Sequence, residues 1–156
     1  MAVLDAYARH ILSYVDVSKL KPLKVVVNAG NGTAGPVVDA LAAYLPFALE
    51  RIYWEPDGRF PHGVPNPLRP ENRAATIKAV QETRADVGVA WDGDFDRCFL
   101  FDEKGNFIEG YYIVGFLAEA FLKKNSGEKI VYDQRAIWNT EEITKNYGGL
   151  SSMPLL

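Results

Sequence analysis

The sequence predicts an α/β fold, a three-layer α/β/α arrangement with a mixed, largely parallel sheet, followed by an incomplete second α/β unit. Helical and strand patterns alternate as far as residue 91, which favours parallel strands joined by helices. A run of β-branched residues at 24–28 is typical of a buried strand. A further helix and strand begin after a short hairpin, so we expect one domain over residues 1–106 and part of another over 107–156.

Two helices flank the first strand. The first is expected over residues 5–15, because apolar side chains recur there at helical spacing and the acidic Asp5 favours a helix start. The second helix begins at Pro36, whose fixed φ suits a first helical turn, and ends at Pro46. A second strand is expected at 48–54.

A long irregular loop then separates this strand from the third helix and strand. Its prolines and glycines are Pro56, Gly58, Pro61, Gly63, Pro65, Pro67 and Pro70. Loops of this length are usually functional or mobile. The third helix opens at Pro70 and Glu71, and the third strand, 85–91, runs directly into a cluster of carboxylates.

The hairpin consists of strands at 98–101 and 107–108. A helix at 112–122 and a strand at 129–132 follow it. The expected apolar side of this helix comprises Ile113, Phe116, Leu117, Ala120 and Phe121. Because the unit is incomplete, these side chains lack partners and are expected to promote association.

The end of the chain, residues 148–156, gives no pattern of a regular element. Cys98 is the single cysteine, which excludes an internal disulfide and a zinc cluster built on thiolates. Its apolar neighbours predict a small core residue rather than a nucleophile. His10 and His62 stand outside any catalytic motif and are expected to be structural or surface residues.

Charge and composition exclude several classes of partner. The formal net charge is −3 and no basic run occurs, so a nucleic-acid binder is not expected. No apolar stretch approaches the roughly 20 residues that span a bilayer, and the first residues do not resemble a signal peptide. We therefore expect a cytoplasmic protein whose ligand is a small molecule.

The most informative motif is Asp92-Gly93-Asp94-Phe95-Asp96-Arg97. Alternate residues of an extended segment project to the same side, so the carboxylates of Asp92, Asp94 and Asp96 are expected to crowd together. A hard cation such as Mg²⁺ would neutralise them. Arg97 adds a donor fork that matches phosphate geometry. A polar turn is the simpler interpretation, but the position at the carboxyl end of a strand favours a metal site.

Two other acidic motifs compete with this interpretation. A calcium loop counted from Asp92 needs glycine at its sixth position, where this chain has Arg97, so an EF-hand is rejected. A phosphatase of the haloacid dehalogenase type also begins with a strand followed by Asp-x-Asp and would use Asp92 as nucleophile. That family expects Thr or Val where Asp96 stands, which leaves it as a weaker alternative.

The segment Gly30 to Gly35 matches the dinucleotide-binding pattern G-x-G-x-x-G, and Glu50 follows about twenty residues later. Two residues separate the first strand from Gly30, however, and Pro36 removes an amide where pyrophosphate would bind. A tight strand-to-helix connection is the preferred interpretation. A dinucleotide-binding domain remains the alternative from another functional class.

With both motifs identified, the chain resembles domain 2 and the start of domain 3 of the α-D-phosphohexomutases, over about residues 5–145. Residues 92–97 match the metal loop of that family, and 28–35 match its first strand-to-helix turn. Residues 95–110 look most like bacterial phosphomannomutases linked to GDP-mannose and surface-polysaccharide synthesis.

The resemblance implies magnesium-dependent interconversion of hexose 6-phosphate and hexose 1-phosphate through a phosphoserine and a bisphosphorylated sugar. It implies that Asp92, Asp94 and Asp96 hold Mg²⁺ together with a phosphate oxygen of the phosphoserine, and that the catalytic Arg97 steadies that phosphate. Arg135 falls where the family has a basic residue that faces the substrate. Mannose phosphate is the favoured substrate, and a phosphoglucomutase is the alternative within the family.

The sequence also departs from the family pattern. It has no phosphoserine loop similar to Thr-Ala-Ser-His-Asn-Pro, and neither the sugar-reading loop of domain 3 nor the phosphate-binding loop of domain 4. The residues from Tyr147 onward drift from the pattern. We therefore expect a fragment that is inactive alone and that works with domains 1, 3 and 4 of a parent enzyme.

Overall fold

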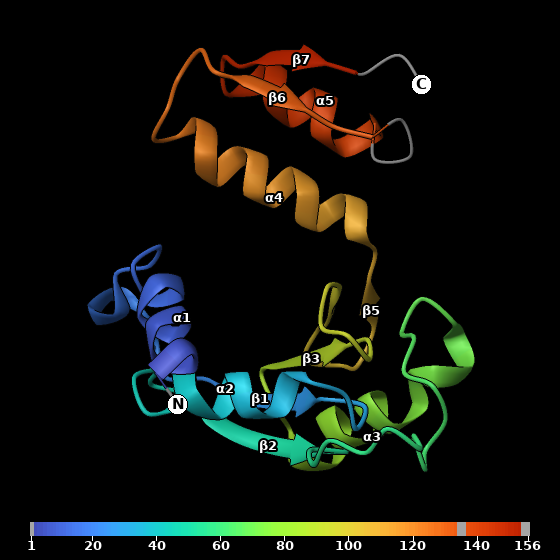
Figure 1. Cartoon of the computed structure of the whole chain (residues 1–156). Helices are drawn as coiled ribbons and strands as arrows, with labels where there is room; N and C mark the ends of the chain where they lie inside the picture. The colour runs from blue at the N-terminus through green and yellow to red at the C-terminus, as the bar shows by residue number, and fades with distance from the viewer. Residues whose placement is uncertain (1, 134–136, 154–156) are drawn as a thin grey trace. The chain divides into compact units, whose positions relative to one another are not determined.

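The computed structural model describes residues 2–133 and 137–153. The chain forms two compact units, which divide between Phe107 and Ile108 (Figure 1). In the described part of the chain, no helix is both long and apolar enough to cross a bilayer.

The first unit alternates helices and strands. Its elements are α1 (Ala2–Leu12), the 3-10 turn η1 (Val17–Lys19), β1 (Lys24–Asn28), α2 (Ala34–Ala42), β2 (Ala48–Ile52), the 3-10 turn η2 (Pro70–Asn72), α3 (Ala74–Thr83), β3 (Val87–Trp91), β4 (Cys98–Phe101) and β5 (Phe107–Ile108).

The strands form one sheet with the order β2-β1-β3-β4-β5. β1 pairs in parallel with both of its neighbours, so that Val26 lies opposite Glu50 of β2 and Gly88 of β3. β4 runs antiparallel to β3, with Cys98 opposite Trp91. The predicted mixed, largely parallel sheet is confirmed.

The core lies on both faces of β1. Val26 is fully buried against Val80 of α3 and against Ala85, two residues beyond the end of α3, so α3 covers this face of the sheet. Val25 and Val27 point to the opposite face because strand side chains alternate, and both are buried. A β-branched run buried on both faces explains why the sequence pattern of this strand lacks polar alternation.

Several helix boundaries differ from the predicted ones. The third helix begins at Ala74, after the 3-10 turn at Pro70–Asn72, and not at Pro70. The first helix ends at Leu12, and Val15 is exposed beyond it. α2 begins at Ala34, ahead of Pro36, and ends at Ala42. The amide of Tyr44 donates to the carbonyl of Leu41, which tightens the chain into a turn before Pro46 is reached.

The prediction that Cys98 is a core residue is wrong. Cys98 is exposed, whereas Phe99 and Phe101 of the same strand are buried. The two phenylalanines pack with Ala90 in a second cluster, to which Phe107 adds its ring. Since alternate side chains of β4 face opposite ways, burial of the phenylalanines turns Cys98 outward.

The second unit contains α4 (Gly110–Leu122), β6 (Lys129–Val131), α5 (Ile137–Asn146) and β7 (Leu150–Ser152). β6 and β7 pair in parallel. The expectation that residues 148–156 form no regular element was wrong, because they contain β7, and α5 was not among the predicted elements. β7 is a short polar segment whose strand conformation depends on pairing with β6.

The buried side of α4 also differs from the predicted one. The buried residues are the small Gly115 and Ala118 and, one turn later, Leu122, whereas Phe116 and Phe121 are exposed. A Cβ atom on Gly115 would lie 2.2 Å from Nδ2 of Asn139 in α5. Close packing of α4 against α5 therefore requires a small residue at position 115. Phe116 and Phe121 face away from α5.

Candidate functional site

The carboxylate loop follows β3 at its carboxyl end, where α/β sheets place ligands. One carboxylate oxygen from each of Asp92, Asp94 and Asp96 lies within 4.8 Å of the other two. Asp92 is buried, with 1% of its surface exposed, and the other two aspartates are exposed. The loop thus presents three hard oxygen donors on one side.

This arrangement suits a single divalent cation. Opposite oxygen ligands of Mg²⁺ lie about 4.2 Å apart, since each Mg–O distance is about 2.1 Å. At most one pair among three ligands can be opposite, and neighbouring ligands lie about 3.0 Å apart. The carboxylate oxygens lie within 4.8 Å of one another, so they need to move only a short way to share one ion. Small side-chain rotations would bring all three to one ion, and the remaining positions would be left for water or phosphate oxygens.

Arg97 supplies the counter-charge inside the loop. Its Nε donates to Oδ2 of Asp92 at 2.5 Å and to Oδ1 of Asp96 at 3.2 Å. Its backbone amide donates to Oδ1 of Asp92 at 3.1 Å. Burial alone would raise the pKa of Asp92, but the hydrogen bonds that Arg97 donates and the positive charge of Arg97 lower it. The buried carboxylate is therefore held in its ionised form.

Phe95 adopts an unusual backbone conformation between two of the aspartates. Its φ is +66°, in the left-handed region that non-glycine residues rarely occupy. Its ring meets the ring of Trp91 edge to face at a centroid distance of 5.6 Å. Packing against Trp91 helps to hold the turn that brings the second and third carboxylates to the same side.

The glycine turn lies directly against the carboxylate loop. The amide of Thr33 donates to the carbonyl of Gly93 at 3.1 Å, and its hydroxyl approaches the same oxygen at 3.4 Å. In the sequence the two motifs lie about sixty residues apart, and no local pattern joins them. The parallel pairing of β1 with β3 was the signal that could have joined them, because the carboxyl ends of adjacent parallel strands meet at one sheet edge.

The amides of the glycine turn already have protein partners. Gly30 N donates to Oδ1 of Asn28 at 2.9 Å, and Thr33 N is bonded to Gly93. The amides of Asn31 and Gly32 donate to backbone carbonyls at 2.7 and 2.8 Å. A pyrophosphate would need such amides free, so the geometry does not favour the dinucleotide-binding alternative.

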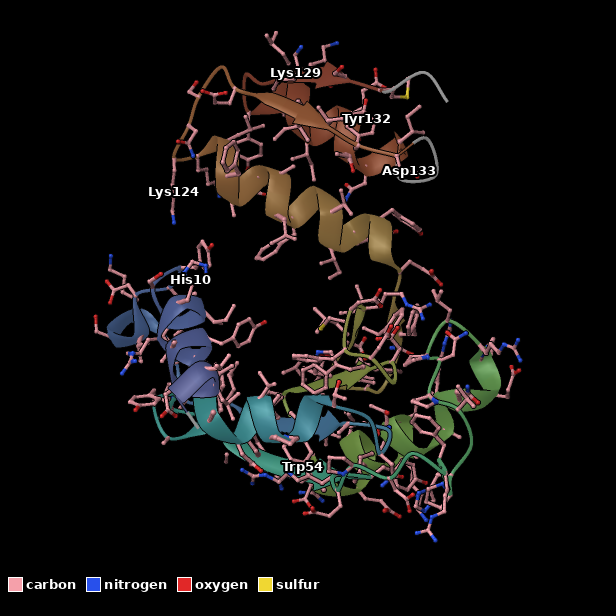
Figure 2. All side chains as sticks on the ribbon, viewed as in Figure 1. His10, Trp54, Lys124, Lys129, Tyr132 and Asp133 are labelled. Atoms are coloured by element: carbon pink, nitrogen blue, oxygen red, sulfur yellow. The ribbon has the colours of Figure 1, made fainter. Side chains whose placement is uncertain are left out.

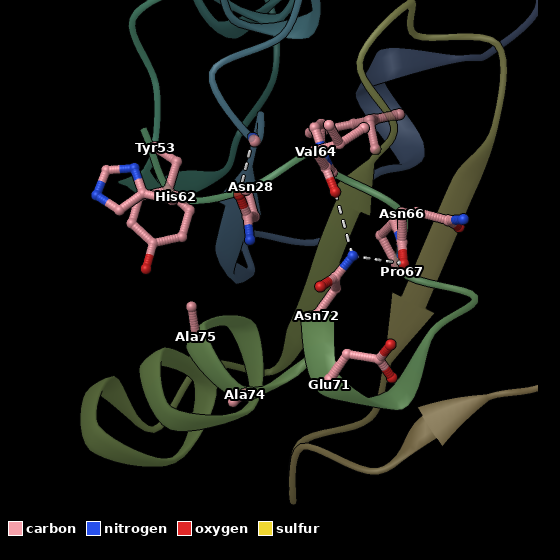
Figure 3. A pocket seen from close by; sticks show the side chains of 14 residues that line it. Asn28, Tyr53, His62, Val64, Asn66, Pro67, Glu71, Asn72, Ala74 and Ala75 are labelled. Atoms are coloured by element: carbon pink, nitrogen blue, oxygen red, sulfur yellow. Dashed lines mark hydrogen bonds between the residues drawn. The ribbon is translucent and has the colours of Figure 1, made fainter. Parts of the chain in front are cut away.

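Behind the glycine turn lies a cavity of about 180 Å³, bordered by the carboxyl ends of β1, β2 and β3 (Figure 3). The rings of Tyr53 and His62 stack on one side of it at 3.8 Å. Asn28 and Asn72 contribute amides, and Glu71 is the one acidic residue among its lining. Within the described residues, no Lys or Arg lines this cavity, so it lacks the charges that phosphate binding needs.

The other candidates from the sequence are placed as follows. His10 is exposed on α1, where its Nε2 lies 3.0 Å from the hydroxyl of Tyr14 (Figure 2). His62 bonds Oδ1 of Asn31 through Nδ1 at 2.9 Å. Both lie at the surface, and their expected lack of a catalytic role stays a prediction. Arg135 lies outside the described residues.

Comparison with known proteins identifies close relatives. Residues 5–105 match the phosphoglucomutase/phosphomannomutase family, alpha/beta/alpha domain II. The chain is 63% identical over 145 residues to a protein of Xanthomonas campestris named phosphohexose mutases. The matched region covers 93% of this chain and 32% of that protein. It is 58% identical over 158 residues to the phosphomannomutase of Salmonella montevideo, covering 98% of this chain and 35% of the relative.

Solved structures agree with the sequence relatives. A phosphoglucomutase/phosphomannomutase family protein from Burkholderia thailandensis superposes with a TM-score of 0.90 at 34% identity, over 97% of this chain and 32% of that one. The chain thus spans about a third of the length of the relatives it matches. On the family match over residues 5–105 and on these identities, this chain belongs to the phosphoglucomutase/phosphomannomutase family.

Proposed function

We propose that this chain provides the metal-binding part of a magnesium-dependent phosphohexomutase, which interconverts hexose 6-phosphate and hexose 1-phosphate. The observation that carries the proposal is the cluster of Asp92, Asp94 and Asp96 with Arg97 at the carboxyl end of β3. Relatives named phosphomannomutase make mannose phosphate the favoured substrate over glucose phosphate. GDP-mannose synthesis is the use we propose for the product.

In this proposal Asp92, Asp94 and Asp96 would hold Mg²⁺, which would supply positive charge beside the phosphoryl group that is transferred. Arg97 offsets part of the negative charge of the three aspartates before the metal binds. Its half-exposed guanidinium then turns to the phosphate of a phosphoserine supplied from elsewhere in the enzyme. Asp92, buried and ionised, fixes the inner side of the site.

We further propose that residues 1–106 act as domain 2 and 107–156 as the start of domain 3. The proposal assigns the phosphoserine and most sugar contacts to domains 1, 3 and 4, so this chain alone is inactive. Arg135 is proposed to face the sugar phosphate. Sugar phosphates are charged and do not cross membranes unaided, so the cytoplasm is the compartment we propose.

A chimeric enzyme tests the proposal. This chain replaces the matching third of the Salmonella phosphomannomutase, to which it is 58% identical, and conversion of mannose 6-phosphate and of glucose 6-phosphate is measured with Mg²⁺. We expect activity, with a loss of about 100-fold or more in Asp94→Asn. Glu103→Gln, a change at an exposed acid outside the loop, serves as control. A folded chimera that is inactive, or one indifferent to Asp94→Asn, would refute the proposal.

A further inference from the structure

Gly32 and Gly93 bring two backbones into direct contact. A Cβ atom built on Gly32 would lie 2.6 Å from the carbonyl oxygen of Gly93 and 2.9 Å from its Cα. No side chain fits in this space without moving one of the two segments. Gly93 lies between Asp92 and Asp94 in the sequence. The glycine turn therefore contacts the backbone that joins two of the candidate metal ligands.

Asn31, the residue before Gly32, connects the glycine turn to the loop that follows β2. Asn31 is nearly buried, with 9% of its surface exposed, and has a left-handed φ of +58°. Its backbone amide donates to Tyr53 O at 2.7 Å, and its carbonyl accepts from Asp57 N at 2.9 Å. Its side chain donates to Glu55 O at 2.8 Å and bonds His62 Nδ1 at 2.9 Å. All its polar groups are therefore tied to residues 53–62.

The long proline-rich loop also covers Gly93 directly. A Cβ atom on Gly93 would lie 3.2 Å from Cζ of Phe60 and 3.6 Å from Cγ of Pro65. Gly93 is thus held between the glycine turn and this loop. Its carbonyl accepts from the amide of Thr33, which fixes the peptide plane that leads into Asp94.

We propose that Asn31 and Gly32 are positioning residues for the metal centre, and that they hold the Gly93 peptide so that Asp92 and Asp94 aim at one ion. This inference rests on the proposed metal-binding function. Magnesium and manganese ions bind oxygen ligands at short, well-defined distances, so a shift of a few tenths of an ångström in the backbone between two ligands weakens binding. Tight metal binding then requires both the spacing of the three aspartates in the sequence and the correct position of the Gly93 peptide.

The test uses the complete chain and Mn²⁺ as a paramagnetic probe. Binding is measured by electron paramagnetic resonance for wild type, Gly32→Ala and Asn31→Gly. The second variant keeps the left-handed backbone but loses both side-chain bonds. We expect Mn²⁺ affinity to fall by about tenfold or more in Gly32→Ala and by a smaller factor in Asn31→Gly.

Two glycine controls separate positioning from folding. Gly58 has open space around its Cβ position, so Gly58→Ala should leave affinity and stability unchanged. Gly88 is crowded, with Val80 Cγ2 at 2.7 Å, but lies within the sheet, so Gly88→Ala should lower stability and keep Mn²⁺ affinity within about twofold. Equal loss of affinity in Gly88→Ala and Gly32→Ala would show a merely structural role and overturn the inference.

A readout without metal distinguishes this inference from the proposed function. Amide hydrogen exchange of Phe95 and Arg97, which bond to Asp92, is compared in the metal-free variants. Faster exchange in Gly32→Ala and Asn31→Gly, but not in Gly58→Ala, supports the positioning role; unchanged exchange overturns it. If wild type and Asp94→Asn bind Mn²⁺ equally, the proposed function itself fails.

Discussion

The carboxylate of Asp92 is buried, and its hydrogen-bond donors come from Arg97, five positions later in the sequence. Both of its oxygens accept hydrogen bonds from Arg97, one from the backbone and one from the guanidinium. Asp94 lies two residues away but is exposed, and its carboxylate belongs to the same cluster. The two aspartates should therefore respond differently to loss of charge.

We predict that Asp92→Asn and Asp94→Asn both abolish Mg²⁺ binding but that only Asp92→Asn destabilises the metal-free protein. Asn at position 92 places an amide donor against the Arg97 donors in a buried site, which should cost about 1–3 kcal/mol of unfolding free energy. Asn at position 94 removes one of three crowded negative charges and should leave stability equal or slightly higher. Urea unfolding in the presence of a chelator measures both. Equal destabilisation by the two substitutions would contradict this account.

Features of the site were predictable where the residues that form them lie close together in the sequence. The alternation of three aspartates predicted that their carboxylates lie together, and the structure brings their oxygens within 4.8 Å of one another. The left-handed Phe95 was not predictable, because an aromatic residue gives no signal for positive φ. The contact between Gly32 and Gly93 joins segments about sixty residues apart, and no local pattern contains it.

Among the elements, β1 and β3 decide where the loop lies. β1 matches its predicted range because three adjacent valines, Val25 to Val27, favour a strand over a helix. α5 and β7 were missed for the opposite reason, since their sequences are polar and become regular through packing with α4 and β6. Propensity is informative for buried strands and weak for elements that depend on tertiary partners.

We predict that Gly88→Ala destabilises the first unit by about 1–3 kcal/mol, because an added methyl group overpacks a tight interface. Position 88 lies in β3, where a Cβ atom would meet Val80 Cγ2 at 2.7 Å, Thr76 Cγ2 at 3.3 Å and Phe101 Cβ at 3.2 Å. The measurement is urea unfolding followed by circular dichroism, with Gly58→Ala as a matched control in open space. Equal midpoints for the two variants would show that α3 packs less closely on the sheet than described.

At the scale of the whole molecule, the fold class was predicted correctly and one helix face was assigned the wrong way round. The sequence places large apolar residues along one side of α4, which normally indicates a buried face. Tight packing with α5 instead selects Gly115 and Ala118. Hydrophobic periodicity identifies a helix reliably but does not say which neighbour it contacts.

We predict that the exposed face of α4 promotes self-association of this chain. Phe116, Leu117 and Phe121 are 65%, 60% and 47% exposed on one helix. Static light scattering should show a mass that rises with protein concentration, and the double substitution Phe116→Glu, Phe121→Glu should abolish the rise. Tyr44→Glu, at an exposed aromatic residue on another element, should not. A wild-type chain that stays monomeric over a wide concentration range would contradict the prediction.

The central claim is that the loop from Asp92 to Arg97 is a metal centre, and calorimetric titration with Mg²⁺ tests it most directly. Wild type and Asp94→Asn are titrated with and without inorganic phosphate, which stands in for the phosphoryl oxygen ligand. We predict weak binding by the wild type that strengthens with phosphate and is absent in Asp94→Asn. Identical heats from the two proteins, with phosphate present, would contradict the claim.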